Sequence, residues 1–259
     1  MREVNAILTL AYRDLLKLLR DPARLISSLA LPLFFIFILG GSLQDSFGSN
    51  SNFDYITFVF TGVLAQTLFQ SAATGIISLI DDRESDFSQE VFVSPISRYT
   101  IILGKITGET LVALTQALGI LVFGLVAGVH FSGGQLLGLG WSGVVCCLFG
   151  AAFGVIILSN LNNRRAADQI FPYVMLPQFF LAGVFNPIQR LPWFLDILSH
   201  LSPMRYAVDF TRDLFYWGRP DYKQAVLQGP AFNFALMGIG FFLFLLLGTF
   251  LFVRKEQNR

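Results

Sequence analysis

Long apolar stretches separated by short polar ones dominate this chain of 259 residues. Stretches without Asp, Glu, Lys or Arg cover residues 25–43, 55–80, 110–129, 136–159, 169–189 and 231–253. A helix of about 20 apolar residues crosses the hydrocarbon core of a bilayer, and these stretches lack the strict alternation of barrel strands. The pattern predicts an all-α membrane protein with six transmembrane helices, at about residues 25–43, 55–80, 106–129, 136–159, 169–187 and 231–253, in one transmembrane domain (25–253).

The first 24 residues show a different pattern, with apolar and basic positions on separate faces of a helix. The apolar stripe comprises Val4, Ile7, Leu8, Ala11, Leu15, Leu18 and Leu19, and the basic positions are Arg13, Lys17, Arg20 and Arg24. This spacing predicts an amphipathic helix that lies along the cytoplasmic membrane surface. No cleavable signal peptide is expected, because the polar start does not lead into a short apolar core. Alternatively, the charges only fix the topology.

Basic residues are distributed unevenly among the connections. They occur in the N-terminal stretch, the second and fourth connections and the tail at 254–259, and are absent from the first and third connections. Lys and Arg accumulate on the cytoplasmic side of membrane proteins, so both termini are predicted to be cytoplasmic. The long fifth connection, residues 190–230, is the exception, and its basic residues are nearly balanced by carboxylates.

The chain has 54% hydrophobic and only 14% charged residues. Few side chains are therefore available as catalytic or metal-binding groups. Glu109 and Asp168 lie at span edges, and Glu109 follows Lys105 by four residues, the spacing of a local ion pair. No spacing indicates a catalytic set or a metal site, and no phosphate-binding Gly-x-x-x-x-Gly-Lys-Ser/Thr loop is present. We therefore expect no enzyme activity and no cofactor in this chain, and a separate ATPase if transport is driven by ATP.

A polar island at residues 81–100 separates the second and third spans. Asp81, Asp82, Glu84, Asp86 and Glu90 give it an acidic surface, and Phe87, Val91 and Phe92 give it an apolar edge ahead of Pro95. Such a segment predicts a short cytoplasmic helix to which a separate ATPase docks. The residues expected to couple to it are Asp82, Arg83, Glu84, Phe87, Glu90, Val91, Phe92 and Pro95. Alternatively, the island is an ordinary charged loop.

Three motifs together resemble ABC exporter permeases of the type-2 class. The first comprises Asp-Arg-Glu at 82–84, Glu90, residues 93–98 and Gly-Lys at 104–105; the second comprises residues 180–187, 191–192 and 202–209; the third is Leu-Arg-Asp-Pro at 19–22. The resemblance covers nearly the whole chain and is closest to small bacterial permeases for drug or lipid export. It implies a half-size subunit that works as a homodimer, with two ATPase subunits that bind ATP and Mg²⁺, in the bacterial plasma membrane.

The resemblance also places a substrate pathway between the second and fifth spans. On the second span Gln66, Gln70 and Thr74 share a helical face beside Phe69, and on the fifth Gln178 neighbours Phe179 and Phe180. Aromatic walls with few amides suit hydrophobic or amphipathic cargo. Alternatively, the amides bond neighbouring helices and the rings only pack.

Pairs of glycine four residues apart, Gly104/Gly108, Gly124/Gly128 and Gly150/Gly154, allow close approach of helices, within one chain or between two.

The external loop after the fifth span is apolar. Residues 191–201 and 203–215 are predicted to form two short amphipathic helices, each opened by proline, that re-enter the outer leaflet and cap the pathway. Asn186, Pro187, Leu191 and Pro192 are the expected external gate. A loop that lies on the surface without gating is the alternative. Arg205, Asp209, Arg212 and Asp213 have spacings that allow ion pairs on the second helix.

The sequence thus predicts a permease subunit of an ATP-driven exporter of drug-like or lipid-like compounds, with no nucleic-acid partner. Export of a glycolipid or polysaccharide is the alternative within transport. A membrane scaffold for a cytoplasmic partner and an ion-coupled carrier are alternatives from other classes.

Overall fold

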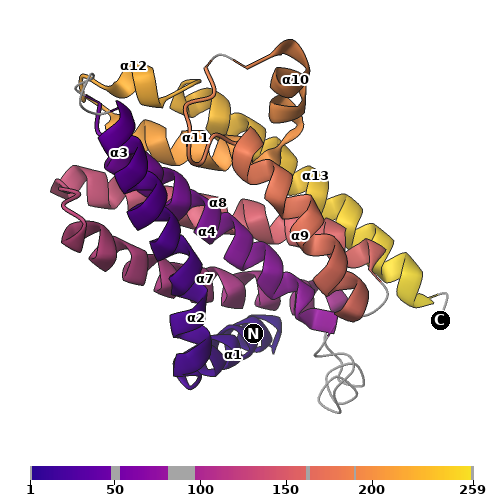
Figure 1. Ribbon diagram of the computed structural model, residues 1–259. Helices are drawn as coiled ribbons and strands as arrows, with labels where there is room; N and C mark the ends of the chain where they lie inside the picture. Colours follow the sequence, from indigo (N-terminus) through magenta and orange to yellow (C-terminus); the bar gives the residue numbers. More distant parts are fainter. Residues whose placement is uncertain (1, 48–52, 81–96, 162–163, 190, 258–259) are drawn as a thin grey trace.

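Helices are the only regular structure in the described part of the chain, which comprises residues 2–47, 53–80, 97–161, 164–189 and 191–257 of the computed structural model (Figure 1). They are α1 (Arg2–Leu19), α2 (Pro22–Phe34), the π-helical turn η1 (Phe35–Gly40), α3 (Gly41–Phe47), α4 (Tyr55–Ile77), α7 (Arg98–Val126), α8 (Gly133–Asn160), α9 (Arg164–Leu181), α10 (Trp193–Leu201), α11 (Pro203–Tyr216), α12 (Tyr222–Ala225) and α13 (Pro230–Gln257). The all-α fold is confirmed.

Within the described residues, five stretches are long and apolar enough to cross a membrane: Pro22–Ser46, Tyr55–Ile77, Tyr99–Val126, Gly133–Asn160 and Tyr222–Leu251. They correspond to the first, second, third, fourth and sixth predicted spans. The second of them, α4, is the buried centre of the bundle and packs against α7, α8 and α11. Figure 1 shows α3, α10 and α12 toward one end of the bundle, and α1, the beginning of α2 and the C-terminus toward the other.

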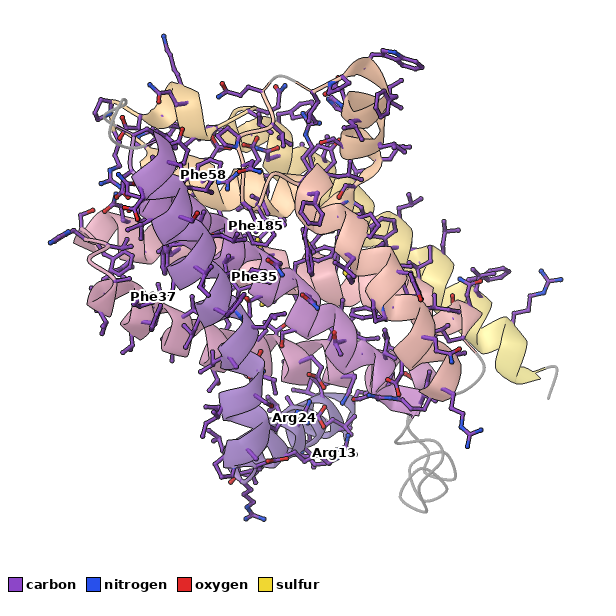
Figure 2. The ribbon with its side chains drawn as sticks, in the orientation of Figure 1. Arg13, Arg24, Phe35, Phe37, Phe58 and Phe185 are labelled. Atoms are coloured by element: carbon purple, nitrogen blue, oxygen red, sulfur yellow. The ribbon has the colours of Figure 1, made fainter. Side chains whose placement is uncertain are left out.

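The first of these stretches is interrupted by a change of helix type. Pro32 lies inside α2 and has no N–H with which to continue the hydrogen-bond ladder, and the π-helical turn η1 begins three residues later at Phe35. The ring of Phe35 packs against Phe185, in the turn that follows α9, at 4.8 Å between centroids (Figure 2). The proline therefore lies next to a local distortion, η1, which contacts the turn after α9.

The fifth predicted span, residues 169–187, corresponds to α9, which is not among the five stretches. Its first turns carry Arg164, Arg165 and Asp168. At 1.5 Å per residue a helix of this length covers about 27 Å, slightly less than a hydrocarbon core. A sixth span is therefore not confirmed by length and composition.

The helix α9 ends at Leu181 rather than at residue 187 because the chain reverses in a Schellman motif. Gly183 has a φ of +68°, in the left-handed region that favours glycine. The N–H of Gly183 donates to the carbonyl of Phe180, and the N–H of Val184 donates to that of Phe179, both at 3.2 Å. The residues that follow form the turn toward α10.

The N-terminal helix α1 packs across the beginning of α7. A Cβ at Gly104 would lie 2.8 Å from the Leu10 side chain, and one at Gly108 would lie 3.1 Å from the Cα of Ala11. On the other side of α1, Val4 and Leu8 are exposed. One apolar side of α1 thus packs on the bundle and another is exposed, whereas its placement along a membrane surface remains a prediction.

The other glycine pairs also pack within the chain. A Cβ at Gly150 would lie 2.2 Å from a backbone oxygen of α4, and one at Gly154 would lie 2.6 Å from another. A Cβ at Gly124 would lie 2.4 Å from the ring of Phe60, whereas Gly128 has a φ of +89° at the end of α7. Gly124, Gly150 and Gly154 thus allow α7 and α8 to pack closely against α4.

Candidate functional site

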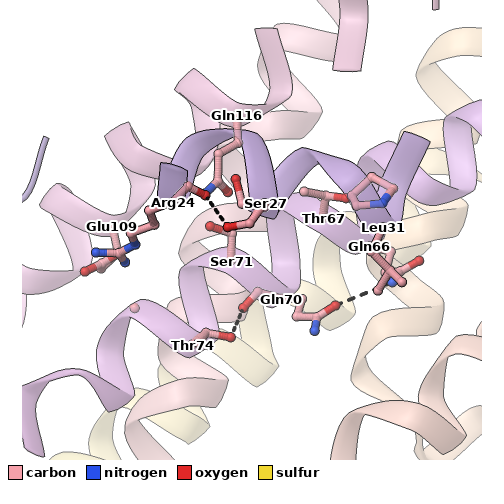
Figure 3. Close-up of a pocket in the computed structure, with 13 residues that line it drawn as sticks. Arg24, Ser27, Leu31, Gln66, Thr67, Gln70, Ser71, Thr74, Glu109 and Gln116 are labelled. Atoms are coloured by element: carbon pink, nitrogen blue, oxygen red, sulfur yellow. Dashed lines mark hydrogen bonds between the residues drawn. The ribbon is translucent and has the colours of Figure 1, made fainter. Parts of the chain in front are cut away.

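A cavity of about 300 Å³ lies between α2, α4 and α7 (Figure 3). Its lining is polar apart from Leu31, Pro32 and Gly75. The polar lining residues are Arg24, Ser27 and Ser28 of α2, Gln66, Thr67, Gln70, Ser71 and Thr74 of α4, and Glu109 and Gln116 of α7. The cavity therefore lies between three of the stretches that are able to cross a membrane.

The α4 wall of the cavity follows from helical periodicity, because Gln66, Gln70 and Thr74 are four residues apart and share one face. Gln66 is 3% exposed, and its Nε2 donates to Oε1 of Gln70 over a long 3.4 Å. The Gln66 Oε1 is buried without a hydrogen-bond partner in the described part of the chain. An acceptor is thus left unsatisfied at this wall.

Several hydroxyl groups of the lining donate hydrogen bonds to backbone carbonyls of their own helices. Thr67 donates to the carbonyl of Val63, and Thr74 donates to that of Gln70, both at 2.8 Å. Ser27 and Ser28 donate to carbonyls one turn earlier in α2. These hydroxyl oxygens keep lone pairs but have no proton left to offer, so toward the cavity they can only accept hydrogen bonds.

A buried charged cluster adjoins the cavity and joins α1 to α7. The Lys105 ammonium lies 2.9 Å from an Asp14 oxygen and 2.8 Å from Oε1 of Glu109. Arg13 binds the other Asp14 oxygen at 2.9 Å. The predicted ion pair between Lys105 and Glu109 is confirmed. Removing one partner of such a buried pair leaves the other charge buried without compensation, which is strongly destabilising. The cluster therefore fixes α1 on α7.

The sequence interpretation did not identify Asp14, although a signal was available. Asp14 lies three residues after Ala11 and four before Leu18, on the apolar stripe of α1. A single carboxylate within such a stripe has to find a buried partner.

The second oxygen of Glu109 reaches the cavity wall. Glu109 is 2% exposed, and its Oε2 has no hydrogen-bond partner in the described residues. It sits against Gly75 of α4, where an added Cβ would lie 1.9 Å from it. Glycine at this position is what allows the carboxylate to reach α4.

Arg24 lies beside Glu109 at the same end of the cavity. Both residues also line an adjoining cavity of about 110 Å³, next to Asp14 and Lys105. Figure 3 shows the Arg24 side chain extending from α2 toward Glu109. No ion pair of the Arg24 guanidinium occurs among the described residues. Sequence reasoning counted Arg24 only as a basic position of the N-terminal stretch.

The residues predicted to line a pathway divide into separate groups. Gln66, Gln70 and Thr74 line the cavity, whereas Phe69 is fully buried and faces α8. The Phe69 ring lies 5.7 Å from that of Phe149. Phe69 therefore belongs to the packing between α4 and α8 in this conformation, and its predicted role in the pathway is untested.

The α9 residues of that prediction lie outside the cavity. Gln178 is buried, and its Oε1 accepts from the N–H of Met204 at 3.3 Å, which ties α9 to the first turn of α11. Phe179 is buried in the core, and Phe180 is 65% exposed. Among the described residues, α9 thus contributes nothing to the cavity that the polar face of α4 lines.

The four residues predicted as an external gate lie between α9 and α10. Asn186 and Pro187 are exposed in the turn after the Schellman motif, Leu191 is partly buried, and Pro192 precedes α10. The two helices predicted for residues 191–201 and 203–215 are confirmed as α10 and α11. Their re-entry into the membrane and their gating role remain predictions.

Arg212 of α11 holds the turn after α9 to α4, a contact that helical spacing within α11 did not reveal. Its Nη2 donates to the carbonyls of Phe58 at 3.3 Å and Val184 at 3.1 Å, and its guanidinium stacks 3.6 Å from the centroid of the Phe58 ring. A Cβ at Gly62 would lie 2.3 Å from the Val184 oxygen. Gly62 and Arg212 together allow the turn after α9 to sit directly on α4.

The carboxylates of α11 also bond to other elements rather than to arginines of the same helix. Oδ2 of Asp209 and Oδ2 of Asp213 accept from the Asn233 amide, at 2.8 Å and 2.9 Å, and Tyr222 donates to Asp213 at 2.6 Å. Burial raises the pKa of the Asp213 carboxyl from 3.8 to about 7, against the hydrogen bonds from Tyr222 and Asn233. The predicted ion pairs within α11 are absent from the described residues. The network ties α11 to α12 and α13.

The eight residues predicted to couple to an ATPase, from Asp82 to Pro95, lie outside the described residues. Within the described residues no group of three or more His, Cys, Asp or Glu side chains could hold a metal ion. Cys146 and Cys147 are buried in the packing of α8.

Comparison with known proteins gives consistent matches. Residues 5–216 match the family described as ABC-2 type transporter. A protein named transport permease ycf38, of Cyanophora paradoxa, is 24% identical over 216 residues, which cover 82% of this chain and 74% of that protein. The inner membrane transport permease YadH of Escherichia coli (strain K12) is 26% identical over 184 residues, 70% of each chain. The daunorubicin resistance ABC transporter permease protein DrrB1 of Streptomyces coeruleorubidus is 23% identical over 224 residues, 82% of this chain and 76% of that protein.

Proposed function

Because the chain belongs to the ABC-2 type transporter family, we propose that it is the membrane-spanning permease subunit of an ATP-driven exporter of hydrophobic or amphipathic, drug-like or lipid-like compounds. In this proposal two copies form the pathway in the bacterial plasma membrane. Two copies of a separate ATPase subunit bind ATP and Mg²⁺ and attach through the segment at residues 81–100. The chain itself carries out no ATP hydrolysis.

The observation that carries this proposal is the polar cavity between α2, α4 and α7. Arg24 lies in the first turn of α2 and Thr74 in the last turn of α4, so one end of the cavity lies where these helices meet the membrane surface that bears α1. The distribution of basic residues assigns this surface to the cytoplasm. A cavity that loads from the cytoplasmic side is what an exporter requires.

The proposed topology has six spans and two cytoplasmic termini. The short helix α9 serves as the fifth span, with Arg164 and Arg165 in the head-group region, where long basic side chains reach the interface. The amphipathic helices α10 and α11 then re-enter the outer leaflet and cap the pathway. The exposed rings of Trp193 and Trp217 support this placement, because tryptophan favours the membrane interface.

Purification from native membranes through a C-terminal tag tests the proposal. We expect an ATPase subunit in stoichiometric amount and ATP hydrolysis by the assembled complex. Replacing Phe87 and Phe92 together by Ala should weaken its attachment about a hundredfold, the effect of losing a desolvated apolar contact of a few kcal/mol. Phe180→Ala is the control, because this exposed ring lies outside the coupling segment.

An intact chain that never co-purifies with an ATPase would refute the proposal and favour a scaffold. Transport that collapses with the proton or sodium gradient while ATP is present would instead indicate an ion-coupled carrier.

A further inference from the structure

The cavity between α2, α4 and α7 has a definite pattern of hydrogen-bonding needs. Oε1 of Gln66 and Oε2 of Glu109 are buried acceptors without partners, and they lie at opposite ends of the cavity in Figure 3. A buried acceptor without a partner costs about 1–3 kcal/mol, so such atoms indicate that an occupant supplies donors. A ligand that binds at the Glu109 end should therefore carry N–H or O–H groups.

The end of the cavity at Glu109 also favours a ligand with a negatively charged group, because Arg24 lies there. Arg24 lies beside Glu109, and its guanidinium has no ion pair among the described residues. A purely cationic ligand would be repelled by the Arg24 guanidinium, and a purely anionic ligand would be repelled by the Glu109 carboxylate. A head group in which an ammonium and an anion are joined by a short linker satisfies both side chains at once.

The ammonium should be primary, because the Glu109 carboxylate requires a hydrogen-bond donor. Oε1 of Glu109 is already bound by Lys105, and Oε2 still requires a hydrogen-bond donor. A primary ammonium has three N–H donors, whereas a trimethylated ammonium has none. The site should therefore distinguish these two head groups, which carry the same charge.

Two residues of the lining, both on α2, offer apolar contacts to the hydrocarbon part of such a ligand. Leu31 and Pro32 line the cavity about two turns further along α2 than Arg24. Leu31 and Phe34 are each more than half exposed on the surface of α2. With its head at Arg24 and Glu109, an amphiphile would lie with its hydrocarbon toward the middle of the bilayer, as a lipid of the cytoplasmic leaflet does.

We propose that this cavity is a binding site for a head group with a primary ammonium linked to a phosphate, as in phosphatidylethanolamine, with the phosphate on Arg24 and the ammonium on Glu109. The inference rests on the proposed function and names the substrate class that the exporter loads. The same chemistry occurs in a membrane lipid and in a water-soluble phosphoethanolamine ester, and the test separates the two.

The test is binding of defined lipids to the purified full-length chain, measured by native mass spectrometry after removal of endogenous lipid. Phosphatidylethanolamine, phosphatidylcholine and phosphatidylglycerol with identical acyl chains are titrated separately. We expect phosphatidylethanolamine to bind at least tenfold more tightly than the other two, since phosphatidylcholine has no N–H donor and phosphatidylglycerol has hydroxyl donors but no cation to pair with Glu109. Equal binding of phosphatidylethanolamine and phosphatidylcholine would overturn the proposal.

Two variants assign the selectivity to the site. Glu109→Gln keeps the shape and leaves Lys105 bound to Asp14, but it removes the charge and one acceptor, so the preference for the primary ammonium should disappear. Arg24→Gln should lower the affinity for phosphatidylethanolamine about tenfold, the loss of one charge-assisted hydrogen bond. The controls Asp168→Asn and Arg20→Gln change exposed groups outside the cavity and should leave binding unchanged. Selectivity that survives both site variants would contradict the assignment.

Competition identifies the source of the head group. Displacement of the lipid by glycerophosphoethanolamine at comparable concentration would show that the head group alone is recognised and would support a soluble ligand. Failure to displace it, with the lipid selectivity intact, would support the lipid as the ligand. If the ATPase co-purifies and hydrolyses ATP but no lipid selectivity is found, this inference fails and the proposed function stands.

Discussion

Replacement of Gly75 by Ala is the most direct test of how Glu109 is seated against α4. An added Cβ at position 75 would lie 1.9 Å from Oε2 of Glu109 and 2.0 Å from its Cδ, far inside any van der Waals contact. The carboxylate would have to leave its place beside Lys105, to which it is bound at 2.8 Å. Overpacking in a closely packed interior costs about 1–3 kcal/mol, so we expect Gly75→Ala to destabilise the chain by about 2 kcal/mol.

The matched control is Gly238→Ala in α13, where an added Cβ meets no atom within 4 Å. Because alanine favours a helix by about 1 kcal/mol over glycine, this variant should be neutral or slightly more stable. The free energy of unfolding of the purified chains, measured in the same detergent, gives both effects.

A double-mutant cycle completes the experiment. Glu109→Ala removes the atoms that the new Cβ would strike, so the cost of Gly75→Ala should fall by at least about 1 kcal/mol in that background. The reasoning would be refuted if Gly75→Ala behaved like Gly238→Ala, or if its cost were the same with and without Glu109.

Three further outcomes are expected. Asp14→Ala should lower stability by about 3 kcal/mol in thermal or chemical unfolding, because it leaves the buried Lys105 with one partner fewer; an equal effect of the exposed control Asp45→Ala would contradict this. Arg212→Leu should increase hydrogen exchange in the turn after α9, because two backbone carbonyls lose their donor; unchanged exchange there would count against the contact. Asp213 has a folded pKa of about 7 against 3.8 unfolded, so its contribution to stability is fully present below pH 3.8 and is lost as the pH rises through 7. Asp213→Asn should remove this component from the pH dependence of unfolding, and an identical pH profile in the variant would refute the assignment.

The positions of most helices could be predicted from the sequence because each apolar stretch is bounded by polar or helix-capping residues. The third span illustrates the limit. Its charge-free part begins at residue 110, but α7 begins at Arg98, since Ser97 caps it and Lys105 and Glu109 are buried by their mutual pairing and by Asp14. Hydropathy registers the charges and not the partners that allow them to be buried.

The cavity was only partly predictable, for a similar reason. The spacing of Gln66, Gln70 and Thr74 identified one wall from α4 alone. The other walls come from Arg24 and Glu109, on helices far apart in the sequence, and no local pattern shows which helices will pack together. The same applies to Arg212, whose spacing within α11 suggested carboxylate partners, whereas the fold gives it backbone carbonyls of α4 and of the turn after α9.

In the proposed exporter, the polar cavity is a cytoplasmic entrance that opens and closes as the ATPase binds and hydrolyses ATP. Thr74→Cys places a thiol at its exposed edge, while the two native cysteines are fully buried and contribute little labelling. In the complex with its ATPase, a membrane-impermeant maleimide added to the cytoplasmic side should label this thiol quickly without nucleotide. It should label the thiol much more slowly when ATP and vanadate trap the ATPase, with Asp168→Cys outside the cavity as the constant reference. Labelling of Thr74→Cys that is the same in both states, while ATP is hydrolysed normally, would contradict the account.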